Sequence, residues 1–147
     1  MRGVFTAGVL DYFLEQDIQF DTCIGVSAGS CLACSYLSKQ HRRGYRTITG
    51  YLDDPRYCGI GSFIKTGDYF GAEMLYKTIP EELDPYDYET FDANPAGFYA
   101  VVTNCETGQA EYKQIRDLRR EICYIRASSS LPPVSYTHLT LPTILLV

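Results

Sequence analysis

The 147-residue chain lacks a long apolar run, an excess of basic residues and more than two histidines. No segment approaches the roughly 20 apolar residues that a membrane-spanning helix needs. The formal net charge of -5 argues against nucleic acid as the main partner, because phosphate binding needs a basic face. The N-terminus also lacks the charged, apolar and cleavage-site succession of a signal peptide. These absences together predict a cytoplasmic protein.

The sequence has little that could hold a metal. Its six cysteines are scattered through segments of strand and helix character, so reduced thiols are predicted. Cys31 and Cys34 form a CxxC, but no second CxxC and no paired histidines complete a zinc set. Their spacing places both on one helix face, where small packing residues are expected. No metal and no cofactor is therefore predicted.

The order of apolar patterns along the chain indicates an α/β fold. The length suits one domain with a single core, and 46% hydrophobic residues is ordinary for a globular protein. An apolar strand over 18–25 is followed by helical spacing from Ala28 to about Lys39, and a hairpin is predicted over 97–113. Further helices are predicted over 3–16, 71–83 and 116–130. Helices alternating with strands predict a sheet that is parallel at least in part.

Ser27 stands between two glycines in "GVSAG", at the point where the first strand gives way to a helix. A strand that reverses straight into a helix crowds the positions two before and two after the serine, and Gly25 and Gly29 occupy them. The amide of Ala28 and the positive end of the new helix would face a developing oxyanion. We therefore interpret 25–29 as a nucleophile elbow. The alternative is a glycine-rich turn whose serine only caps the helix.

A serine hydroxyl needs a neighbour that accepts its proton, and the chain offers few candidates. His41 ends the helix that starts at Ser27, about 20 Å away at a rise of about 1.5 Å per residue. His138 lies late in the chain, where a triad histidine could lie. An acid acting alone is the remaining option.

Three segments together resemble the bacterial patatin-like phospholipase family: "MRGVFTAGVLDYFLEQ", "CIGVSAGS" and "YIRASSSLPPV". The resemblance covers residues 1 to about 133 and implies a three-layer fold with a mainly parallel central sheet flanked by helices. It also implies a Ser-Asp dyad with Ser27 as the nucleophile. Arg2 and Gly3 would be the last residues of the oxyanion loop, with the Gly3 and Ala28 amides holding the oxyanion. The implied substrate is a lipid or another acyl ester.

The sequence departs from this family at both ends. It contains no Asp-Gly pair, the motif in which the family carries its aspartate, and the glycines that should precede Met1 are absent. From Val134 onward the chain resembles the translation of a sequencing adapter. We therefore expect residues 1–133 to be a partial domain and 134–147 a non-native tail. On this view His138 has no role, the aspartate is missing and the chain as given is nearly inert.

The predicted function is that of a serine acyl hydrolase acting on lipid esters. An acyltransferase on the same elbow and a noncatalytic lipid-binding module remain alternatives, and a Ser-His-Asp hydrolase using His138 is a further one. The basic run "KQHRRG" also has two interpretations. It either places cations at the end of the Ser27 helix, with Gly44 as a stop, or attracts an anionic lipid surface and gives peripheral membrane contact.

Overall fold

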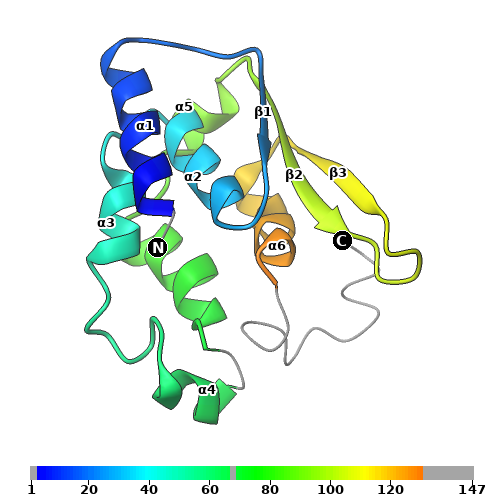
Figure 1. Ribbon diagram of the computed structural model, residues 1–147. Coiled ribbons are helices and arrows are strands. Elements are labelled where there is room, and N and C mark those ends of the chain that lie inside the picture. The colour runs from blue at the N-terminus through cyan, green and yellow to red at the C-terminus, as the bar shows by residue number, and fades with distance from the viewer. Residues whose placement is uncertain (1–2, 67–68, 131–147) are drawn as a thin grey trace.

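The computed structural model describes residues 3–66 and 69–130. Helix α1 comes first, followed by strand β1 and a helical region, and the chain then closes with a hairpin and a last helix (Figure 1). The elements are α1 (Gly3–Glu15), β1 (Thr22–Gly25), α2 (Ala28–Leu37), α3 (Arg43–Thr49), α4 (Ile60–Thr66), the π-helix η1 (Met74–Leu83), α5 (Tyr88–Asp92), β2 (Gly97–Thr103), β3 (Ala110–Ile115) and α6 (Leu118–Ser128).

The three strands form one sheet in the order β1-β2-β3. β1 pairs with β2 in parallel, with Cys23 opposite Phe98. β2 and β3 form the predicted antiparallel hairpin, with Phe98 opposite Ile115. Its turn contains Gly108 at a φ of 70°, a left-handed conformation that glycine adopts without steric cost. The described sheet therefore has one parallel and one antiparallel pair.

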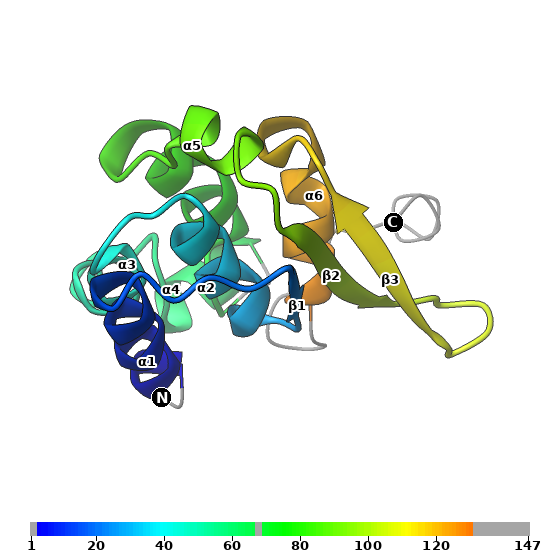
Figure 2. The same ribbon diagram turned by 90° about the horizontal axis from the view of Figure 1, so that it is seen from above.

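Helices α2 and α6 pack against the same face of this sheet (Figure 2). Alternation along β2 turns Phe98, Ala100 and Val102 toward the helices, where all three are buried. On the opposite face, Ile24 and Tyr112 are 60% and 61% exposed. The predicted α/β fold, incomplete in the described part, is confirmed, and the described helices cover one face of the sheet.

The helix that follows Ser27 is shorter than predicted. α2 ends at Leu37 with Ser38 as its C-cap. The prediction that Gly44 stops this helix is wrong, because Gly44 is buried inside α3. A Cβ on Gly44 would lie 2.6 Å from Leu32 Cδ2, so the glycine allows α3 to approach α2 closely.

The helix predicted over 71–83 forms as the π-helix η1, which buries Met74, Ile79 and Pro80. Proline lacks an N–H and its ring clashes with the carbonyl four residues earlier, which disfavours regular α-helical bonding here. The wider spacing is seen at the end of η1, where the Asp84 N–H bonds the Ile79 carbonyl at 2.9 Å. Within the described residues, no helix is both long and apolar enough to cross a membrane.

Candidate active site

The turn between β1 and α2 holds Ser27 in a strained backbone conformation. Its φ of 54° and ψ of -128° lie outside the regions that a non-glycine residue ordinarily occupies. Such a conformation costs about 1–3 kcal/mol and persists only where the surroundings enforce it. The Ser27 carbonyl accepts hydrogen bonds from the Ser30 N–H at 2.9 Å and the Ser30 Oγ at 2.6 Å. Ser27 is the N-cap residue of α2, but its side chain makes no capping hydrogen bond.

The two glycines that flank Ser27 are under very different constraints. A Cβ on Gly25 would lie 2.5 Å from Ser30 Cα and 2.8 Å from Ser30 N, which are backbone atoms that cannot move aside. A Cβ on Gly29 would have no heavy atom within 4 Å among the described residues. The predicted crowding is therefore present at Gly25 and absent at Gly29. The difference arises because Gly29 already lies within the first turn of α2, facing outward.

The first residues of α1 and α2 lie close together at this turn. A Cβ built on Gly3 would be 4.0 Å from the Ala28 Cβ, and both residues line the same cavity. Within the described part of the chain, the Ala28 N–H donates no backbone hydrogen bond. The positive ends of two helices therefore lie close together beside Ser27, where they would favour a negative charge. Arg2, the other residue expected in the oxyanion loop, lies outside the described residues.

A cavity of about 550 Å³ opens beside Ser27 and extends between α2, α3, η1 and α6. Its size is ordinary for a small-molecule site. Most of its lining is apolar or aromatic: Gly3, Ala28, Leu32, Ile48, Tyr57, Phe70, Leu75, Tyr76, Ile79, Tyr86, Leu118, Ile122 and Ile125. The lining residues with thiol, hydroxyl or charged groups are Ser27, Cys31, Cys34, Arg43, Thr47 and Ser129. Such a chamber can receive a hydrocarbon chain whose reacting end lies at Ser27.

Burial raises the pKa of the tyrosine and cysteine side chains that line the cavity. Loss of solvent raises the pKa of Tyr57 to about 12 and raises the pKa of Tyr76 further. Burial also raises the pKa of the Cys31 and Cys34 thiols, so neither is a thiolate at neutral pH. All six cysteines are free, as predicted, but Cys31 and Cys34 line the cavity as well as packing.

No carboxylate or histidine is among the described residues that line this cavity. His41 Nε2 instead lies 2.8 Å from Glu15 Oε1, on the surface, and His138 lies outside the described residues. Among the described residues, no group of three or more His, Cys, Asp or Glu side chains could hold a metal ion. The described part of the site thus combines the Ser27 hydroxyl with the N-terminal ends of α1 and α2, and no carboxylate or histidine is among its described lining residues.

Arg43 lines the cavity and is a buried member of the basic run 39–44. It is 2% exposed, and its guanidinium stacks on the Tyr86 ring at 3.5 Å from the ring centroid. Arg43 Nη1 donates to Ser35 Oγ at 3.1 Å, while its Nε donates to the Asp84 carbonyl at 3.0 Å. Arg46 binds both Asp84 carboxylate oxygens at 3.0 Å. Arg43, one of the cations considered for lipid attraction, is therefore occupied within the fold, and so is Arg46 just beyond that run.

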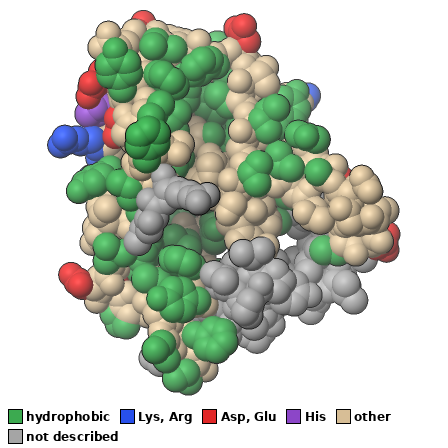
Figure 3. Space-filling model, in the orientation of Figure 1, with side chains coloured by type: hydrophobic (Ala, Val, Ile, Leu, Met, Phe, Trp, Pro, Cys, Tyr) green, Lys and Arg blue, Asp and Glu red, His purple; other side chains and the backbone are tan. Residues whose placement is uncertain are grey.

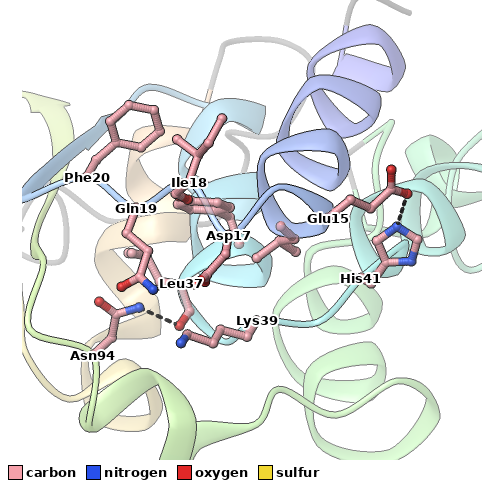
Figure 4. A pocket seen from close by; sticks show the side chains of 11 residues that line it. Glu15, Asp17, Ile18, Gln19, Phe20, Leu37, Lys39, His41 and Asn94 are labelled. Atoms are coloured by element: carbon pink, nitrogen blue, oxygen red, sulfur yellow. Dashed lines mark hydrogen bonds and ion pairs between the residues drawn. The ribbon is translucent and has the colours of Figure 1, made fainter.

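A second cavity, of about 310 Å³, lies at the opposite end of α2 (Figure 4). Its labelled side chains come from the end of α1, the end of α2 and the loops beside them. The Asn94 amide points to the Leu37 carbonyl, and Glu15 and His41 pair at the other side. Unlike the Ser27 cavity, this one is lined by side chains of both charges, and no serine, threonine or cysteine is among its described lining residues.

Exposed apolar side chains gather at the end of the molecule where α4 lies (Figure 3). Ile60 and Ile64 are 73% and 77% exposed, and Phe63 is 45% exposed. The segments on either side of α4 supply Tyr57 and Phe70 to the Ser27 cavity, and these two rings pack edge to face. The apolar surface formed by Ile60, Phe63 and Ile64 thus lies on the segment of chain between two residues that line the cavity.

One contact of the elbow was not predicted from the sequence. The Ser27 N–H donates to Ser128 Oγ at 2.9 Å, across 101 residues of chain. Ser128 belongs to the "ASSS" segment, which carries part of the family resemblance. The resemblance therefore includes the end of α6, but a single sequence gives no signal of which of its hydroxyls contacts Ser27.

Comparison with known proteins agrees with this arrangement. A family model described as patatin-like phospholipase matches residues 1–141. The chain is also 27% identical over 139 residues to the uncharacterized protein YjjU of Escherichia coli (strain K12). That alignment covers 89% of this chain and 37% of YjjU, so the chain spans little more than a third of this relative. No solved structure gave a significant match. The expected division at residue 133 concerns a tail outside the described residues and stays a prediction.

Proposed function

The chain belongs to the patatin-like phospholipase family, a family of lipid acyl hydrolases, and we propose that the complete protein hydrolyses lipid esters with Ser27 as its nucleophile. The observation that carries this proposal is the strained Ser27 at the mouth of a largely apolar cavity of about 550 Å³. An acyl chain in that cavity would leave its ester carbonyl beside Ser27.

In the proposed reaction, Ser27 Oγ attacks the ester carbonyl carbon while its proton passes to a base. The resulting oxyanion is held by the Ala28 and Gly3 amides at the ends of α2 and α1. The ester C–O bond then breaks, and the alcohol leaves with the proton from the base. Water hydrolyses the acyl-enzyme in the reverse sense and restores Ser27.

The proposed base is the aspartate of an Asp-Gly pair, which the family resemblance implies and which the 147 residues do not contain. A dry, apolar site would raise the pKa of such an aspartate, because loss of solvent disfavours its charged form, and would make it a better proton acceptor. Without that residue, the 147-residue chain by itself is expected to be nearly inert. The test therefore uses the protein expressed from the complete gene.

Replacing Ser27 with alanine tests the assignment. We expect Ser27→Ala to lower ester hydrolysis by about 10⁴- to 10⁶-fold, by analogy with loss of a catalytic triad residue. A fluorophosphonate probe should label the wild-type protein at Ser27 and leave the variant unlabelled. Ester turnover by Ser27→Ala at the wild-type rate would contradict the proposal.

The same assay separates the alternatives. An acyltransferase would form a new ester or thioester only when an acceptor alcohol or thiol is added. A noncatalytic lipid-binding module would leave Ser27 unlabelled in the complete, folded protein.

We also propose a cytoplasmic setting with peripheral contact to a lipid surface. Six free thiols support a reducing compartment, and the exposed Ile60, Phe63 and Ile64 beside the cavity wall support contact with lipid. The protein should sediment with phosphatidylcholine vesicles, and replacing Ile60 and Ile64 with serine should lower the bound fraction several-fold. Equal sedimentation of this double variant would contradict a docking role for α4.

A further inference from the structure

The last residue of α6 contacts the backbone of the nucleophile itself. Ser128 Oγ accepts a hydrogen bond from the Ser27 N–H at 2.9 Å. The remaining hydrogen bonds of the turn stay within it, from Gly29 N–H to the Val26 carbonyl and from Ser30 N–H to the Ser27 carbonyl, both at 2.9 Å. Among the described residues, Ser128 is therefore the hydrogen-bond partner that the Ser27 N–H finds in a different element of the fold.

The Ser27 backbone needs such an external partner. Strand β1 and its pairing with β2 end at Gly25, two residues before Ser27, so the sheet does not supply an acceptor for the Ser27 N–H. If the Ser27 backbone relaxed to a commoner φ and ψ, the Ser27 Oγ and the neighbouring Ala28 N–H would move with it. An acceptor fixed from outside opposes that relaxation.

Helix α6 is well suited to provide a fixed acceptor. Its inner face buries Leu118 and Ile125, and it packs on β2, β3, α2, α5 and η1. At its C-terminal end, Ser129 Oγ lies 3.9 Å from Cys31 Sγ in the Ser27 cavity. The end of α6 therefore contacts both the elbow and the cavity, and its position is fixed by core packing rather than by a loop.

We propose that Ser128 is a positioning residue for the nucleophile, whose hydroxyl holds the Ser27 amide so that Oγ and the Ala28 N–H face the bound ester. This role rests on the proposed function of Ser27. It acts through the backbone of Ser27 and needs no contact between Ser128 and the substrate. Loss of the hydroxyl should therefore change kcat and the reactivity of Ser27 more than KM.

The test compares three variants of the complete protein. Ser128→Ala removes the acceptor, and Ser128→Thr keeps a hydroxyl. Ser130→Ala removes a hydroxyl that donates to the Arg126 carbonyl, four residues earlier, at 2.9 Å. We expect Ser128→Ala to speed hydrogen exchange of the Ser27 amide about 5- to 10-fold, the effect of one lost hydrogen bond. Fluorophosphonate labelling and kcat should fall about 10- to 100-fold, because small misplacements of reacting groups are costly. KM should stay within about twofold, and Ser128→Thr should restore most of the rate.

The outcomes are distinguishable. If fluorophosphonate labels the wild-type protein and labels Ser128→Ala at the same rate, the positioning role alone is overturned. This holds whether or not hydrogen exchange of the Ser27 amide has changed. Equal losses in Ser130→Ala and Ser128→Ala would also overturn it, since a general weakening of the helix end would then explain both. A wild-type protein that neither labels nor hydrolyses esters would overturn the proposed function, and this inference with it.

Discussion

The two ends of α2 differ in how their backbone groups are hydrogen-bonded. At the N-terminal end, α2 begins after the strained Ser27, and the Ala28 N–H donates no backbone hydrogen bond within the described residues. At the C-terminal end, the carbonyls of the last turn all accept hydrogen bonds. There the Leu37 carbonyl accepts from Asn94 Nδ2 at 2.9 Å, and the Ser38 N–H donates to the Cys34 carbonyl at 3.0 Å. One end is thus left open to a ligand, and the other is closed by the protein itself.

The cavities at the two ends follow the same division. The cavity at Ser27 is largely apolar and holds neutral phenols and thiols, while the cavity at Leu37 carries Glu15, Asp17, Lys39 and His41. Apolar walls favour a hydrocarbon chain and strengthen electrostatic interactions with the developing oxyanion. The charged side chains of the cavity at Leu37 favour water instead. The comparison indicates that substitutions at the first end should affect chemistry, and substitutions at the second should affect stability.

Among the substitutions that compare the two ends of α2, the largest effect is expected at Gly25. In Gly25→Ala the new methyl group would meet the Ser30 backbone at 2.5 Å, so the turn must shift. A displacement of about 1 Å at a reacting group can cost about 10²-fold in rate, and we expect fluorophosphonate labelling of Ser27 to fall at least that far. Thermal unfolding monitored by circular dichroism should also show a lower midpoint.

Gly29→Ala is the matched control, because it adds the same methyl group two residues beyond Ser27 instead of two before it. It meets no described heavy atom within 4 Å, and alanine favours a helix over glycine by about 0.5–1 kcal/mol. Labelling should stay near the wild-type rate, with stability equal or higher. If both variants lost labelling equally, the contrast between the two glycines would be wrong.

Much of the Ser27 end could be predicted from the sequence because its signals are local. The apolar strand, the G-x-S-x-G spacing and the helical pattern after Ala28 correctly locate the turn, and the family resemblance brings Gly3 to it. The hairpin of β2 and β3 was likewise predictable, since alternating residues and a turn at Gly108 lie next to one another in the chain.

Other features depend on contacts between distant segments, which one sequence does not reveal. The space around a Cβ at Gly29 depends on how α2 is oriented relative to its neighbours. The burial of Arg43 depends on Asp84 and Tyr86, about 40 residues away, so a run of cations that looked solvated is partly internal. The hydrogen bond from Ser27 to Ser128 crosses almost the whole described domain.

A smaller effect, of a different kind, is expected at the Leu37 end. The Asn94 side chain donates to the Leu37 carbonyl and accepts from the Ala96 N–H at 3.0 Å, so Asn94→Ala removes two hydrogen bonds. We expect the free energy of unfolding, measured by urea titration, to fall by about 1–2 kcal/mol. Gln19→Ala removes an exposed bond to Asp17 beside the same cavity, and its effect should stay within about 0.5 kcal/mol. Both variants should label with fluorophosphonate at the wild-type rate when assayed well below their unfolding midpoints. Slower labelling in folded Asn94→Ala would mean that the C-terminal end of α2 also positions Ser27, and the division between the two ends would not hold.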